Sequence, residues 1–138
     1  MQGPPNRPAP FLRLGLVVLA LPNLASGLFA LVAPQDWFDT FSVGDLGGYN
    51  DHLVRDVGGA FVATSVLLLV AAVWIRRSVI YTALTGWLLF NVPHLINHIV
   101  ERGALSDTEY ATVLGILGFN VLLAVILWLA TRRRRPPA

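Results

Sequence analysis

The sequence contains no cysteine, no lysine and only 13% charged residues. Without cysteine the chain has no disulfide, no thiolate metal ligand and no thiol catalysis. Soluble domains carry roughly 25% charged residues, so this composition argues against a compact water-soluble protein. Aliphatic residues dominate instead, which also argues against a disordered chain and against a nucleic-acid partner.

Apolar residues make up 55% of the 138 positions, and the mean hydropathy is +0.64. A membrane-spanning helix needs about 20 predominantly apolar residues. Four runs meet this length, at about 11–33, 51–75, 78–100 and 108–131. They predict an all-α, four-transmembrane-helix up-down-up-down bundle over residues 11–131, with the lipid bilayer as its surroundings. Segments 1–10 and 132–138, which are rich in proline and arginine, are predicted to be disordered cytoplasmic tails.

Arginine sets the predicted orientation. Eight of the ten arginines fall on one side of the four spans. They are Arg7, Arg13, Arg76, Arg77 and Arg132 to Arg135. The other side holds Arg55, Arg102 and all eight acidic residues. The positive-inside rule therefore predicts a multi-pass membrane protein with both termini in the cytoplasm.

Two further features bear on packing. The long loop over residues 35–50 carries four aromatic residues and is predicted to lie at the membrane interface, either as an anchor or as a lid over a cavity. Small residues mark predicted helix-packing faces. These are Ser26, Gly27 and Ala30, then Gly58, Gly59 and Ala63, and finally Gly115 and Gly118.

Ionisable residues interrupt the second and third spans. An intramembrane charge costs about 2.5–3.5 kcal/mol on insertion scales, so such residues usually face the bundle interior and have a function. At 100° per residue, the polar residues of each of these two spans lie within one arc of about 80° around the helix axis. The predicted ligand-binding residues are His52, Arg55 and Asp56 on the second span and Asn91, His94, His98 and Glu101 on the third. All three histidines of the chain belong to these two stripes.

A rise of 1.5 Å per residue places Asn91 near the middle of the membrane. Asn23, Thr64 and Asn120 fall at a similar depth on the other three spans. The four spans are therefore expected to form a polar well that opens outward.

Three chemistries fit this cluster. A divalent metal ion could be held by His94 and His98, with His52 and Asp56 completing the shell. Alternatively, b-type haem could take its axial ligands from His52 and from a histidine of the third span. As a third alternative, histidines and carboxylates could perform acid–base chemistry on a lipid-soluble ligand such as a quinone or an isoprenoid.

A structural interpretation competes with all three. Arg55 would pair with Asp56 or Glu101, and the polar network would fix the geometry of the bundle. The protein would then be a non-catalytic scaffold or accessory subunit, working as a homo-oligomer or within a larger membrane complex.

Two short segments resemble motifs of a known group. Residues 50–60 are similar to an N-x-H-x-x-R-D-x-G motif, and residues 91–98 to a V-P-H-x-x-x-H motif, of small four-span integral membrane proteins of actinobacteria that are grouped as DoxX-like. The resemblance implies residence in the bacterial inner membrane and a motif at His52, Arg55, Asp56, His94 and His98. DoxX-like proteins are linked by analogy to quinone or thiol redox chemistry, and the absence of cysteine leaves no thiol role here.

Overall fold

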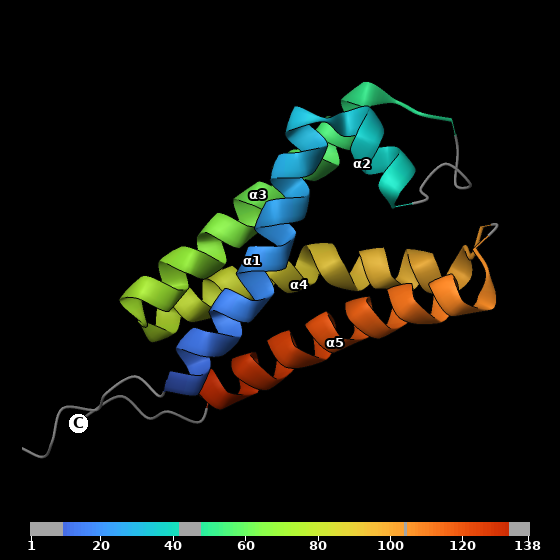
Figure 1. Ribbon diagram of the computed structural model, residues 1–138. Coiled ribbons are helices and arrows are strands. Elements are labelled where there is room, and N and C mark those ends of the chain that lie inside the picture. The colour runs from blue at the N-terminus through green and yellow to red at the C-terminus, as the bar shows by residue number, and fades with distance from the viewer. Residues whose placement is uncertain (1–9, 42–47, 104, 133–138) are drawn as a thin grey trace, which may run out of the picture.

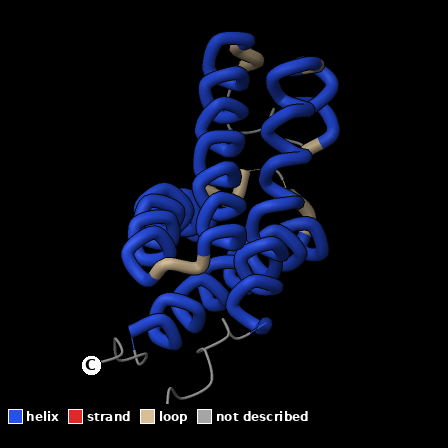
Figure 2. The backbone as a smooth tube through the Cα atoms, turned by 90° about the vertical axis from the view of Figure 1, so that its left-hand side faces the viewer, coloured by secondary structure: helices blue, strands red, loops and turns tan. Residues whose placement is uncertain are grey.

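The computed structural model describes residues 10–41, 48–103 and 105–132, and these are entirely helical apart from short connections (Figures 1 and 2). The helices are α1 (Pro10–Val32), α2 (Pro34–Thr40), α3 (Asp51–Trp74), α4 (Arg77–Val100) and α5 (Asp107–Arg132). All but α2 are long and apolar enough to cross a membrane. The predicted fold of four antiparallel spans is thus confirmed. The predicted tails fall on residues 1–9 and 133–138, which lie outside the described residues.

Local sequence explains where the helices begin and end. Asn50 caps α3, because its side-chain oxygen accepts a hydrogen bond of 3.1 Å from the Leu53 amide. Ser106 and Glu109 form a capping box at the start of α5, in which the Ser106 amide donates to the Glu109 carboxylate at 2.9 Å. The turn from α3 to α4 is short, and its Ile75 adopts a left-handed conformation with φ of 41°.

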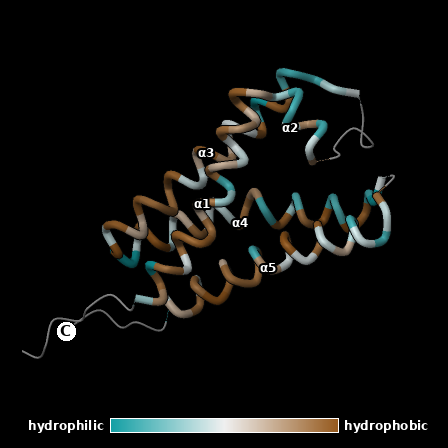
Figure 3. Tube along the Cα trace, viewed as in Figure 1, coloured by the Kyte–Doolittle hydropathy of each residue, from teal (hydrophilic) through white to brown (hydrophobic). Residues whose placement is uncertain are grey.

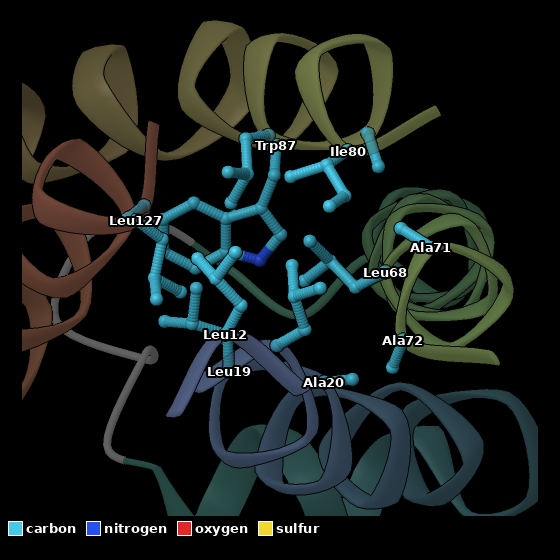
Figure 4. Close-up of a cluster of buried hydrophobic side chains, with 13 residues drawn as sticks. Leu12, Leu19, Ala20, Leu68, Ala71, Ala72, Ile80, Trp87 and Leu127 are labelled. Atoms are coloured by element: carbon cyan, nitrogen blue, oxygen red, sulfur yellow. The ribbon is translucent and has the colours of Figure 1, made fainter. Parts of the chain in front are cut away.

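The long helices form two pairs, α1 with α3 and α4 with α5 (Figure 1). The pairs meet at the end of the bundle that carries the α3–α4 turn, which we call the termini end. All four long helices contribute to one apolar core there, with Trp87 at its centre (Figure 4). Its largest fully buried apolar members are Leu12, Leu16, Leu19, Leu68, Ile80, Leu84, Trp87 and Leu127.

The two pairs diverge toward the opposite end, which we call the α2 end (Figure 1). A smaller apolar cluster there consists of Ala30, Trp37, Val54 and Phe61. Helix α2 packs on α1 and α3, and the Trp37 indole N–H donates to the Ser26 hydroxyl at 2.9 Å. Within the described chain, α2 has no contact with α4. The described part of the aromatic loop segment thus packs on the first pair, while its residues 42–47 lie outside the described part.

Helices α1 and α3 touch through their backbones at Gly27 and Gly58. A Cβ atom placed on Gly27 would lie 2.8 Å from the Gly58 carbonyl oxygen, and one on Gly58 would lie 2.9 Å from the Gly27 carbonyl oxygen. Neither carbonyl can move without moving its helix. Close backbone approach through small residues is the usual way in which membrane helices associate, so the predicted packing role of these two glycines is supported.

The other predicted small-residue faces do not pack in this way. A Cβ atom on Gly59, Gly115 or Gly118 would have no neighbour within 4 Å, and Ala63 is exposed. These positions follow the helical spacing of a packing face, but the rotation of each helix about its axis turns them away from the other described helices.

We expect Gly58→Ala to lower the free energy of unfolding by about 1–3 kcal/mol, because the added methyl group must push α1 and α3 apart. Gly59→Ala is the matched control, since it adds the same methyl group one residue away in open space. The measurement is thermal or denaturant unfolding of both variants in detergent. Equal stability of the two variants would contradict the close contact.

Candidate functional site

The polar residues at the start of α3 form two local ion pairs. His52 Nε2 lies 3.4 Å from Asp56 Oδ2, with both side chains largely exposed at 88% and 63%. Arg55 Nε lies 2.8 Å from Asp51 Oδ2. The predicted pairing of Arg55 with Asp56 or Glu101 is therefore not formed.

Tyr49 extends this group beyond the helix. Its hydroxyl donates to Asp51 at 2.9 Å. Loss of hydration and this contact with a carboxylate hold the pKa of Tyr49 above its ordinary value.

Arg55 also contacts the neighbouring helix. Its Nη1 donates to the carbonyl oxygen of Leu31, in the last turn of α1. Carbonyls in the last turn of a helix have no partner within that helix, so Arg55 caps the end of α1. Arg13 does the converse, because its Nε donates to the Ala72 carbonyl in the last turn of α3 at 3.0 Å. In the α1–α3 pair, a carbonyl in the last turn of each helix thus accepts a hydrogen bond from an arginine of the other helix.

The two histidines of α4 form a separate group. Their ring centroids are 4.8 Å apart and the rings are nearly perpendicular. His94 stacks on Phe90 at 6.0 Å, and Phe61 of α3 meets the His94 ring edge-on at 6.3 Å. Neither imidazole has a hydrogen-bond partner among the described residues. The result is an aromatic group, which we call the imidazole cluster, of Phe61, Phe90, His94 and His98.

The two predicted stripes do not meet in one site. Within residues 10–41, 48–103 and 105–132, no three His, Asp or Glu side chains come close enough to hold a metal ion. His52 and Asp56 lie at the start of α3, which leads away from α4 where the helix pairs diverge (Figure 1). Glu101 follows α4 as an exposed residue. The predicted metal set of His52, Asp56, His94 and His98 is therefore not assembled among the described residues.

The predicted polar well is not a connected network either. Asn23, Thr64 and Asn91 each donate to a backbone carbonyl four residues earlier in their own helix, at 3.1, 2.8 and 2.9 Å. These three side chains are thus satisfied within their own helices, with Asn91 buried one turn below His94, whereas the buried Ser65 hydroxyl of α3 has no partner among the described residues. Figure 3 shows the resulting pattern, in which hydrophilic residues follow one part of α4 within an otherwise apolar span.

Phe61 and Phe90 were not among the predicted site residues. Phe90 precedes His94 by four residues, which places both on one helix face. From that spacing, the sequence could have predicted the contact between Phe90 and His94. Phe61 comes from another helix, and its contact with His94 depends on how α3 and α4 are rotated against each other.

Comparison with known proteins returned no match: no protein-family model, no curated protein and no solved structure is similar to this chain. The resemblance to DoxX-like proteins stays a prediction, carried by the residues of the two motifs.

The two neighbours His52 and Arg55 should differ in their effect on stability. Arg55→Met removes the cap on α1 and the pair with Asp51, so we expect a lower melting temperature. His52→Ala removes only an exposed pair, so we expect no measurable change. The measurement is the melting temperature of both variants in detergent. A melting temperature of Arg55→Met that equals that of the wild type would show that the contact with Leu31 does not hold α1.

Proposed function

We propose that this multi-pass membrane protein binds a small lipid-soluble ligand at the imidazole cluster. The observation that carries the proposal is the pair of adjacent imidazoles on an apolar span, with no hydrogen-bond partner among the described residues. They lie in the half of the bundle where the helix pairs diverge (Figure 1).

Unpaired polar groups in a membrane are costly. His94 and His98 are partly buried, and an imidazole nitrogen that faces the bilayer core without a partner has no water there to replace it. A neutral imidazole offers one N–H donor and one acceptor nitrogen. A ligand with two oxygen acceptors would accept a hydrogen bond from the N–H group of His94 and from that of His98.

The aromatic neighbours indicate the shape of the ligand. Phe61 and Phe90 lie 5.6 Å apart with their rings nearly perpendicular. Aromatic faces and edges of this kind favour contact with a flat ring. A quinone-type head group combines a flat ring with oxygen acceptors, and its apolar tail would remain in the lipid.

Metal and haem binding fit less well. A zinc ion takes three or four protein ligands, whereas α4 offers two imidazoles and no carboxylate of the described residues completes the set. Two histidines one turn apart on one helix also cannot bind opposite faces of the same haem iron.

We expect His94→Phe and His98→Phe each to weaken binding of a short-chain quinone about tenfold, the effect of losing one hydrogen bond in an apolar site. Phenylalanine keeps the ring contacts and removes the nitrogens. His52→Phe is the matched control, because it changes the remaining histidine outside the cluster. The measurement is titration calorimetry of the purified protein in mild detergent.

Elemental analysis and an absorption spectrum of the natively purified protein complete this experiment. Unchanged quinone affinity in both α4 variants would refute the proposed site. Bound metal or haem that disappears in the same variants would replace the quinone-type ligand with the other chemistry.

We also propose that the termini end faces the cytoplasm of a bacterial cell. Arg13 and Leu31 are 18 positions apart in α1, which corresponds to a rise of about 27 Å, close to the ~30 Å thickness of a hydrocarbon core. The two interhelical arginine caps thus lie one bilayer thickness apart. The termini end carries Arg76, Arg77 and Arg132 besides Arg13, which the positive-inside rule assigns to the cytoplasm.

The absence of cysteine allows a direct test of this orientation. We expect Gln35→Cys to react with a membrane-impermeant maleimide in intact spheroplasts, and Ser78→Cys to react only after permeabilisation. Both side chains are exposed, so the comparison reports the membrane side and not burial. The reverse pattern would invert the orientation.

A scaffold role is the second candidate, and the openness of α5 favours it. Of an 18-residue apolar stretch of α5, 11% is buried, compared with 33% of the corresponding stretches of α1 and α3. Gly115 and Gly118 lie open on this helix, which leaves a surface for a second copy or for another membrane protein. Cross-linking in native membranes would test this role, and a purely monomeric pattern would argue against it.

A further inference from the structure

The surface around Arg13 is hollowed on both sides of this residue. One hollow of about 280 Å³ lies between α1 and α3 and is lined by Arg13, Val17, Leu69, Ala72 and Val73. A second, of about 340 Å³, is lined by Pro10, Arg13, Leu14 and Val17. Arg13 is the only charged residue in either lining. We call the two hollows together the Arg13 groove.

The guanidinium of Arg13 is held in a fixed orientation. Its Nε donates to the Ala72 carbonyl at 3.0 Å. Within the described residues, its Nη1 and Nη2 groups have no acceptor. A planar guanidinium oriented through Nε presents its remaining donors as a fork, which is the geometry that suits a phosphate.

The groove changes from polar to apolar along the membrane normal. Arg13 and Ala72 lie at its termini end. Val17 and Leu69 are each about one helical turn further toward the middle of the membrane, and no polar residue accompanies them. This order matches that of a phospholipid, in which the phosphate lies at the boundary and the acyl chains lie below it.

The charge around the groove has one sign. Arg76, Arg77 and Arg132 lie at the same end of the bundle, and the described part of this end contains no acidic residue. The acidic residues that the structure describes fall within 36–41, 48–56 and 101–109, at the other end. The termini end is therefore complementary to an anionic lipid, to which each basic residue near the surface contributes about 1 kcal/mol of attraction.

We propose that the Arg13 groove binds one anionic phospholipid of the leaflet at the termini end. The Arg13 guanidinium binds the phosphate beside Val73, and an acyl chain lies along Val17 and Leu69. This site is separate from the imidazole cluster and does not depend on the proposed ligand.

Native mass spectrometry of the full chain, released from nanodiscs of mixed phosphatidylglycerol and phosphatidylcholine, tests the proposal. We expect one retained phosphatidylglycerol in the wild type and an apparent affinity about tenfold lower in Arg13→Gln. Arg76→Gln is the matched control, because it removes the same charge at the same end without lining the groove. Equal losses in both variants would show diffuse surface attraction only and would overturn the site.

A second variant separates lipid binding from the role of Arg13 in capping α3. Val73→Trp fills the groove, leaves Arg13 in place, and is expected to release the bound lipid as well. Retention of the lipid in Val73→Trp would show that the groove does not hold it and would refute the site. Competition by inorganic phosphate alone would show a free-anion site instead. Dimers that are lost in Val73→Trp while lipid adducts persist would show that a second copy covers the groove.

Discussion

The approach of the α1 and α3 backbones at Gly27 and Gly58 constrains the rest of the bundle. Carbonyl oxygens of two helices lie where any side chain would intrude, so the axes of α1 and α3 are close and their rotation is fixed. This rotation buries Phe61 and Val54 beside Ala30, and it places Arg55 next to the last turn of α1. The residues of the α3 motif therefore serve first to join two helices.

The pairing of α1 with α3 also explains why function is proposed on α4. The first pair is held together by the glycine contact, by two arginine caps and by α2. The α4–α5 pair joins it through the core around Trp87 and diverges toward the α2 end (Figures 1 and 4). The imidazoles of His94 and His98, which have no hydrogen-bond partner among the described residues, lie where the α4–α5 pair separates from the α1–α3 pair.

Much of the architecture could be predicted from the sequence, because span length and charge follow directly from the bilayer. The four predicted spans agree with the long helices to within a few residues. Which residues meet could not be predicted in the same way. Periodicity places Gly58 and Gly59 only 100° apart on one helix, and contact with α1 distinguishes them. Likewise, it places His52 and His94 on polar faces but does not reveal that α3 and α4 diverge between them.

Ile75 has a consequence for how the bundle loosens. A β-branched residue in the left-handed region costs roughly 1–2 kcal/mol, which glycine would avoid. Its side chain packs against the core of the termini end, and this packing offsets the backbone strain. The reversal between α3 and α4 is therefore conditional on an intact core. A harsh detergent that penetrates this core would release the turn early, before the glycine-tight crossing of α1 and α3 gives way.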